Sequence, residues 1–331
     1  MRVMFNSSTV ARVATAAFVV LSLPVVAAMS GPSSATPQAS GRLNPIIAAQ
    51  EKGLPIFGIA HPAIVARGAG RGGAAATPPA TPPPPAPPIV LADAAKETVA
   101  YTRADYLFTS GTSETFLNYL KEITAAGGSA RTHPFVAKIG IFHANPENST
   151  SAIVRQLNAG HVSVNMEGVE SAQEVRDVVK AMRFVSAGGT RPETGLENAA
   201  AYWGLTIDQY KQKADVWPLN KNGELLIGAI VESIEGLAKV REIAAEPAVA
   251  QIFAGYGTLG GVFRGDPEGR EAAAAKILAA CKEFKKPCGF PTNNPAEMEQ
   301  RMKEGWSVFI MQRRDEAGLA AIETGRKLGK R

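Results

Sequence analysis

The chain has 331 residues, with 35 Lys and Arg against 30 Asp and Glu, a formal net charge of +5, and 45% hydrophobic residues. This composition is close to that of soluble globular proteins, which excludes a wholly disordered or collagen-like chain. Because aromatic residues make up only 7% and the charge is mild, we expect no nucleic-acid partner. The two cysteines exclude a four-thiolate zinc site.

The first residues have the pattern of a secretory signal. Arg2 and Arg12 give a positive start, an apolar run covers 13–28, and small residues follow it. We therefore expect 1–35 to be a signal peptide with a disordered N-terminus, and the mature protein to be periplasmic or secreted without membrane contact. The run is shorter than the ~20 apolar residues that comfortably span a bilayer, and an uncleaved anchor is the alternative interpretation.

The two cysteines, Cys281 and Cys288, are close in sequence, with six residues between them. In an oxidising compartment they could form a disulfide that closes a short loop. The alternative is a pair of ordinary small side chains buried in the core.

Taken in chain order, the elements begin with a helical pattern after Asn44, a turn at Gly53 and a short strand over 55–60. Residues 67–88 follow, rich in Gly and Ala and then in Pro, and we expect this stretch to be a disordered insertion. Beyond it, apolar runs alternate with amphipathic patterns. The expected strands are 106–110, 135–140, 161–166, 225–232, 251–257, 287–292 and 306–311. The expected helices are 113–126, 149–159, 171–183, 237–245, 268–284, 295–304 and 316–327.

Eight strand–helix units with mostly continuous apolar strands indicate an α/β protein with parallel strands buried on both faces. We predict a closed (β/α)₈ TIM barrel that forms a single domain over 44–331. An open doubly wound sheet is the competitor, but no Gly-x-Gly-x-x-Gly fingerprint follows any strand. The proline-rich insertion then follows strand 1 on the C-terminal face, where barrel sites are built.

Acidic residues at the C-terminal ends of strands are the first site candidates. Glu232 ends the apolar run IGAIVE, where a carboxylate must be paired, protonated or bound to a metal. Glu167 has the same placement after strand 4. For both, a helix-start carboxylate favoured by the helix dipole is the structural alternative.

Two of the four histidines are expected on the same face. His61 follows strand 1 and His143 follows strand 3, where an imidazole can act as a general base or proton donor. His133 and His161 precede or open their strands and belong to the opposite, stabilising face. A surface histidine without a role is the simpler explanation for His61 and His143.

Several strings resemble the HpcH/HpaI aldolase/citrate lyase family. They are NPIIAAQEKGLPIFGIAHP, RQLNAGHVSVNMEGVESAQEV, the loop AGGTR that ends at Arg191, and AIVESIEGLAKVREIAAEPAVAQIFAGYGTLG. The resemblance covers the chain from Asn44 onward, apart from the insertion. It implies a pyruvate/phosphoenolpyruvate-type barrel that cleaves aldols, with a divalent metal, Mg²⁺ or Mn²⁺, that offsets charge on the enolate. It also implies a small carboxylate substrate and a homo-oligomer.

Carried over to this chain, the family pattern is incomplete. The metal Glu falls on Glu232, but the metal Asp falls on Thr258, and the segment with the catalytic His falls on 110–113. The substrate Arg of strand 3 falls near Lys138, which keeps the charge without the bidentate fork. We expect Glu232 and Glu167 to be the metal ligands and His143 and His61 to be the proton shuttles. Expected at the substrate are Lys138, Arg191, Gly255, Gly257 and Thr258.

Two functions remain open from the sequence. The first is a metal-assisted aldolase-type carbon–carbon lyase acting on a 2-oxo or hydroxy acid. The second is an exported barrel that has lost catalysis and binds a small carboxylate or a protein partner. The loss of the family's His and Asp favours the second, whereas replacements on the correct face favour the first.

Overall fold

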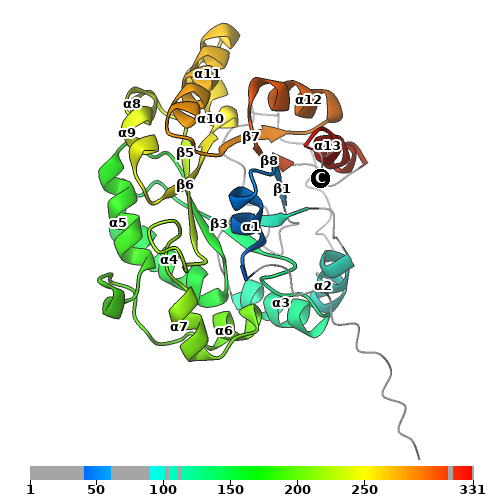
Figure 1. Cartoon of the computed structure of the whole chain (residues 1–331), viewed down its shortest axis with the longest axis vertical. Coiled ribbons are helices and arrows are strands. Elements are labelled where there is room, and N and C mark those ends of the chain that lie inside the picture. The colour runs from blue at the N-terminus through cyan, green and yellow to red at the C-terminus, as the bar shows by residue number, and fades with distance from the viewer. Residues whose placement is uncertain (1–40, 61–89, 101–103, 111–113, 312–315, 330–331) are drawn as a thin grey trace, which may run out of the picture. The chain divides into compact units, whose positions relative to one another are not determined.

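The computed structural model describes residues 41–60, 90–100, 104–110, 114–311 and 316–329. Eight parallel strands form a closed barrel in sequential order, with β8 paired to β1, as predicted (Figure 1). The residues assigned to the signal peptide and to the proline-rich insertion lie outside the described ranges. The strands are β1 (Ile56–Ala60), β2 (Tyr106–Ser110), β3 (Phe135–Ile139), β4 (Ser163–Met166), β5 (Leu226–Val231), β6 (Val249–Ala254), β7 (Cys288–Thr292) and β8 (Val308–Met311).

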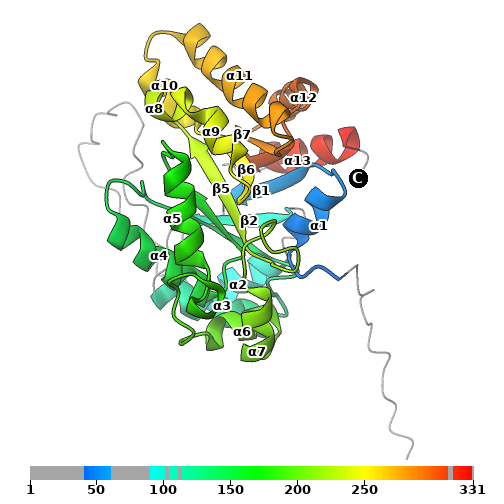
Figure 2. The ribbon, with the colours of Figure 1, turned by 60° about the vertical axis from the view of Figure 1, so that its left-hand side comes forward.

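Helices surround the strands, as the turned view shows (Figure 2). Most follow a strand, which is the connection that neighbouring parallel strands require. They are α1 (Pro45–Glu51), α2 (Leu91–Ala100), α3 (Glu114–Ala125), α4 (Pro146–Ala159), α5 (Ala172–Met182), α6 (Glu197–Trp203), α7 (Ile207–Lys213), α8 (Ile234–Ala238), α9 (Val240–Ala245), α10 (Tyr256–Val262), α11 (Pro267–Glu283), α12 (Pro295–Glu304) and α13 (Glu316–Leu328).

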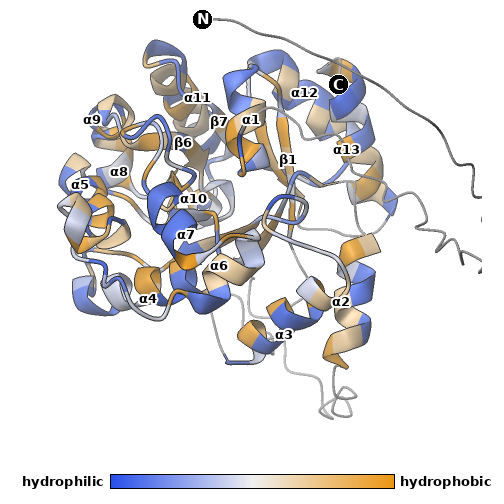
Figure 3. Ribbon diagram, turned by 60° about the horizontal axis from the view of Figure 1, so that its bottom comes forward, coloured by the Kyte–Doolittle hydropathy of each residue, from blue (hydrophilic) through white to orange (hydrophobic). Residues whose placement is uncertain are grey.

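Helix α5 shows how the sequence specifies these outer elements. Ser171 caps its start by accepting a hydrogen bond from the backbone N–H of Glu174, which satisfies a donor that the helix cannot. Val175, Val178 and Met182 recur at helical spacing and are fully buried against the barrel. Hydrophilic and hydrophobic residues are mixed on helices such as α3 and α12 in the same way (Figure 3).

The expected strand over 251–257 is wrong at its end. Strand β6 stops at Ala254, Gly255 caps the next turn, and α10 begins at Tyr256. Glycine and small residues there gave no strand or helix period, so the boundary could not be read from the pattern. The helices α2, α6 and α7 were not predicted, because each is short or follows a stretch without clear periodicity.

A disulfide joins Cys281, near the end of α11, to Cys288 at the start of β7, with 5.8 Å between the Cα atoms. This arrangement is the paired one of the two alternatives. In the part of the chain that the structure describes, no helix has the length and apolar character to cross a bilayer.

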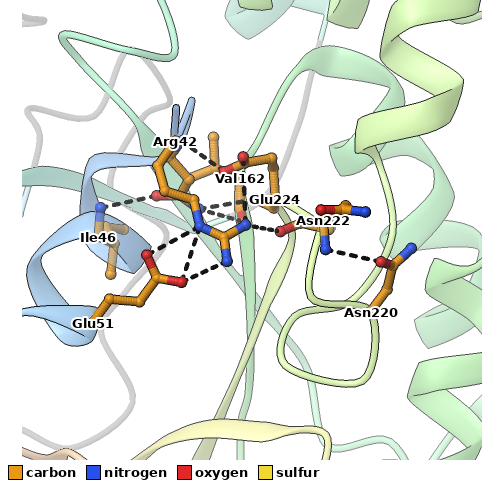
Figure 4. Close-up of polar contacts among 9 residues, drawn as sticks. Arg42, Ile46, Glu51, Val162, Asn220, Asn222 and Glu224 are labelled. Carbon is orange, nitrogen blue, oxygen red and sulfur yellow. Dashed lines mark hydrogen bonds and ion pairs between the residues drawn. The ribbon is translucent and has the colours of Figure 1, made fainter. Parts of the chain in front are cut away.

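Helix α1 lies against the N-terminal ends of β4 and β5 (Figure 4). Its cap, Asn44, donates side-chain hydrogen bonds to the backbone carbonyls of Val162, just before β4, and Glu224, just before β5. The Asn44 backbone N–H donates to the buried carboxylate of Glu224 at 3.0 Å. Because Ile46 and Ile47 are also buried, both polar and apolar contacts hold α1 at the N-terminal end of the barrel.

His161 lies on the stabilising side, where the sequence placed it. Its ring is fully buried and stacks on Phe116 with 4.8 Å between ring centroids. Nδ1 donates to the carbonyl of Gln156 at 2.9 Å, so Nε2 accepts from the Thr109 hydroxyl at 3.1 Å. Burial lowers the pKa of His161 to about 4, and the bond to Gln156 offsets only part of this effect.

We expect His161 to make the fold sensitive to mild acid. The unfolded chain binds a proton near the ordinary histidine pKa, but the folded chain does not until about pH 4, so stability is present above pH 6.5 and lost as the pH falls. This residue alone should lower the free energy of unfolding by about 1.5 kcal/mol between pH 6.5 and 5. Urea titrations of the wild type and His161→Gln at both pH values measure the difference.

The matched control is His143→Gln, which removes a histidine whose side chain is 42% exposed. Equal acid-induced losses in the wild type and His161→Gln would contradict the assignment.

Candidate functional site

A lysine–carboxylate pair stands at the C-terminal end of the barrel, where β3 and β4 run side by side. Lys138 is paired in register with Asn165 on β4, so the two side chains point to the same side of the sheet. The Lys138 ammonium lies 2.8 Å from the Glu167 carboxylate, which directly follows β4. It also lies 5.3 Å above the centre of the Phe108 ring of β2. Both charged side chains are about one-third exposed, at 33% and 34%, so solutes can reach them.

Glu232, directly after β5, joins this pair. The Thr258 hydroxyl and the backbone N–H of Gly168 lie beside its carboxylate and favour the ionised form. Burial raises the pKa of Glu232 above its usual range, and the negative charge of Glu167 adds to the rise, while Thr258, Lys138 and Gly168 oppose it. A carboxylate with a raised pKa is a stronger base than an ordinary glutamate, which suits a group that accepts a proton from a substrate.

Because Gly255 has no side chain, the Glu232 carboxylate can occupy the space next to it. A Cβ atom on Gly255 would stand 2.3 Å from Glu232 Cβ and 2.4 Å from Oε2. Gly257, two residues on, has open space around the same position. Three residues of the glycine-rich loop were predicted to lie at the substrate. Gly255 and Thr258 lie next to Glu232, whereas Gly257 has no such contact.

His143 lies at the same end of the barrel but belongs to a separate group of charges. Its Nδ1 is 3.2 Å from Glu174 Oε2 and its Nε2 is 3.7 Å from Glu170 Oε2. Both ring nitrogens thus face carboxylates of the segment that begins α5. His61, the other predicted proton shuttle, lies outside the described residues.

Arg191 is not near this cluster, which corrects the expected substrate-binding role. It lies between α5 and α6, is completely buried, and stacks its guanidinium 4.5 Å above the Phe184 ring. Its Nη2 donates to Asn158 Oδ1 and to the Tyr210 hydroxyl, each at 2.9 Å. A guanidinium enclosed in this way ties α4 to α7 and is not open to a substrate. The AGGTR pattern suggested a substrate loop, but the pattern alone could not reveal that its arginine is buried.

The two carboxylates expected to hold a metal do come together, but their surroundings do not fit Mg²⁺ or Mn²⁺. Glu167 is already paired with the ammonium of Lys138, and the charge of Lys138 also acts on the partly buried Glu232. These ions need several free hard oxygens, and a neighbouring ammonium repels them. Within the described ranges, no three His, Cys, Asp or Glu side chains are grouped as a metal site.

Two contributors were missed by the sequence reasoning, Gly168 and Phe108. Gly168 has φ of +56°, a conformation that L side chains rarely adopt, and this turn aims its N–H at Glu232. A glycine directly after a strand-end carboxylate was the available signal. Phe108 gave no signal, because an aromatic residue in a strand is ordinarily part of the core.

Comparisons with known proteins agree with this architecture. Residues 144–290 match the family model of HpcH/HpaI aldolase/citrate lyase. This range begins just before α4 and includes the whole of β4 to β6. A hydroxypyruvate/pyruvate aldolase from Paraburkholderia phytofirmans is 27% identical over 234 residues, which are 66% of this chain and 82% of that protein. A 2-dehydro-3,6-dideoxy-6-sulfogluconate aldolase from Pseudomonas putida is 27% identical over 164 residues, 48% of this chain and 60% of that protein.

A solved structure of an HpcH/HpaI aldolase/citrate lyase family protein from Burkholderia cenocepacia has the same fold. It superposes with a TM-score of 0.58 at 21% identity and covers 84% of this chain and 94% of that protein. The chain therefore resembles the HpcH/HpaI aldolase/citrate lyase family in sequence over residues 144–290 and has the fold of a solved member of that family.

Proposed function

We propose that the protein is an aldolase-type carbon–carbon lyase that cleaves a hydroxylated 2-oxo acid. The observation that carries the proposal is the meeting of Lys138, Glu167, Glu232 and Thr258 at the C-terminal end of the barrel. An accessible ammonium beside a carboxyl group of raised pKa provides the two elements that aldol cleavage needs: a cation for the acid and a group that moves a proton.

In the cleavage direction, the Glu232 carboxylate would accept the proton of the substrate's 4-hydroxyl group. The bond between C3 and C4 then breaks, C4 leaves as an aldehyde, and the remaining electron pair forms the enolate of a 2-oxo acid. Glu232 then returns this proton to C3, which completes the product; the reverse of this last step is proton exchange at C3 of pyruvate. The raised pKa of Glu232 supports this role, because a base with a higher pKa takes up a proton more readily.

The names of relatives support the choice of product. Two of them are called hydroxypyruvate/pyruvate aldolases. We therefore propose pyruvate or hydroxypyruvate as the 2-oxo acid that the cleavage releases or that the reverse reaction consumes.

The experiment that tests this function is proton exchange at C3 of pyruvate in deuterium oxide, followed by NMR, because enolate formation alone is enough to give a signal. The wild type should catalyse exchange, and addition of an aldehyde should give an aldol adduct detected by mass spectrometry. Glu232→Gln should lower the exchange rate by about 10²- to 10⁴-fold, the usual contribution of a positioned acid–base group.

Glu235→Gln is the matched control, since Glu235 is an exposed carboxylate three positions further on. It should exchange at the wild-type rate. A wild type that binds pyruvate but catalyses neither exchange nor adduct formation would instead favour a non-catalytic barrel that binds small carboxylates, in line with Thr258 at the family's metal Asp position.

A further inference from the structure

We propose that the ammonium group of Lys138 supplies the positive charge that a divalent metal was expected to supply, so that this barrel acts on 2-oxo acids without a metal. The inference deepens the proposed function and rests on it. It names Lys138 as the residue that contacts the reacting oxygens.

The position of Lys138 carries the first step. Its side chain leaves β3 on the same side as Asn165 of β4, and a Cβ on Gly228 of β5 would meet Asn165 Oδ1 at 2.2 Å. These three positions therefore face one another across neighbouring strands. Glu232 directly follows β5, and its carboxylate is close enough to Lys138 and Glu167 for their charges to shift its pKa. Lys138 and Glu232 thus look onto the same space at the barrel end.

The hydrogen-bond capacity of Lys138 carries the second step. An ammonium group has three N–H donors, and Glu167 takes one of them at 2.8 Å. The other two can reach the carboxylate oxygen and the 2-oxo oxygen of one substrate molecule, which are neighbours in any 2-oxo acid. Glu167 then serves as a positioning residue, because it holds the ammonium on the side that faces Glu232.

The balance of charge carries the third step. As the bond between C3 and C4 breaks, its electron pair moves to the 2-oxo oxygen, and the hydroxyl proton moves to Glu232. The Lys138 ammonium offsets the negative charge that forms on that oxygen, which is the task of the metal in the resembling aldolases. The Lys138 ammonium lies 2.8 Å from Glu167 and its charge also favours the ionised form of Glu232, so it provides the counter-charge for both carboxylates.

The first test is the metal dependence of the full chain. After EDTA treatment and dialysis, pyruvate exchange should stay within about twofold of the untreated rate, and calorimetry should detect no Mn²⁺ binding up to about 1 mM, with or without oxalate. Exchange that EDTA abolishes and Mn²⁺ restores would overturn the proposal.

The second test is the affinity for oxalate, an analogue of the pyruvate enolate, measured by calorimetry in EDTA. Lys138→Met should weaken binding by about 10- to 100-fold, the effect of losing hydrogen bonds from a charged donor. Lys138→Arg keeps the charge and should recover most of the affinity. Lys180→Met, which removes an exposed lysine paired at 3.7 Å with Asp177 on α5, should bind oxalate as the wild type does. An unchanged oxalate affinity in Lys138→Met would contradict the proposed role of Lys138.

A covalent role is excluded or revealed by borohydride reduction with pyruvate. No mass increase is expected, and a pyruvate-derived adduct on Lys138 would overturn the electrostatic role. The two proposals fail in different ways. Metal-free oxalate binding that needs Lys138, without any turnover, leaves the present inference standing and removes the lyase. Turnover that requires Mn²⁺ would support the lyase and overturn the metal-free role of Lys138.

Discussion

Replacing Gly255 with alanine should lower kcat/KM for the proposed aldol reaction by about 100-fold while leaving the barrel folded. The added methyl group would stand 2.4 Å from Glu232 Oε2, so the carboxylate must move. A displacement of about 1 Å in a reacting group is enough for a loss of this size. The φ of Gly255 is −73°, which any L residue adopts, so the substitution tests the contact and not backbone strain.

Gly257→Ala is the matched control for this prediction. Gly257 also lies in the glycine-rich segment, but nothing stands within 4 Å of its Cβ position. Since it is a helical residue of α10, alanine should keep activity and raise the stability by up to about 1 kcal/mol. Steady-state kinetics of both variants, with thermal melts, give the comparison. Full activity in Gly255→Ala would mean that the position of Glu232 does not matter for turnover.

Arg42→Ala should lower the free energy of unfolding by about 3 kcal/mol, because it leaves a buried carboxylate without its counter-charge. Glu224 is completely buried, and Arg42 Nη1 lies 3.6 Å from its Oε1 (Figure 4). That oxygen forms no hydrogen bond to any residue in the described ranges. The guanidinium of Arg42, itself 16% exposed, also donates to the carbonyl of Gly223 at 3.1 Å.

A second substitution in the Arg42→Ala background separates the effect of charge from that of lost packing. Glu224→Gln placed in the Arg42→Ala background should recover part of the loss, because the unpaired buried charge is gone. Glu51→Ala removes the other carboxylate bound to Arg42, but that side chain is 40% exposed, so its cost should stay under about 1 kcal/mol. Urea unfolding at pH 7 measures all three. Equal losses for Arg42→Ala and Glu51→Ala would show that the buried charge is not the cause.

The barrel could be predicted from the sequence because it consists of repeated strand–helix units, each of which has a local sequence pattern. Strand β2 was predicted at its observed bounds and helix α12 likewise, since an apolar run between turn signals and a capped amphipathic helix need no knowledge of distant residues. The parallel arrangement followed from strands such as β5, whose residues are all buried. Boundaries failed where glycine interrupts the pattern, as at the start of α10.

The site was predicted only in part, for a physical reason. The ends of parallel strands meet on one rim, so the sequence by itself placed Lys138, Glu167 and Glu232 at one end of the barrel. Only the tertiary structure decided that Lys138 bonds to Glu167, that the N–H of Gly168 reaches Glu232, and that Arg191 is enclosed far from both. Pairing and burial depend on the distances between strands and helices remote in sequence, and a residue's type does not encode which neighbour it meets.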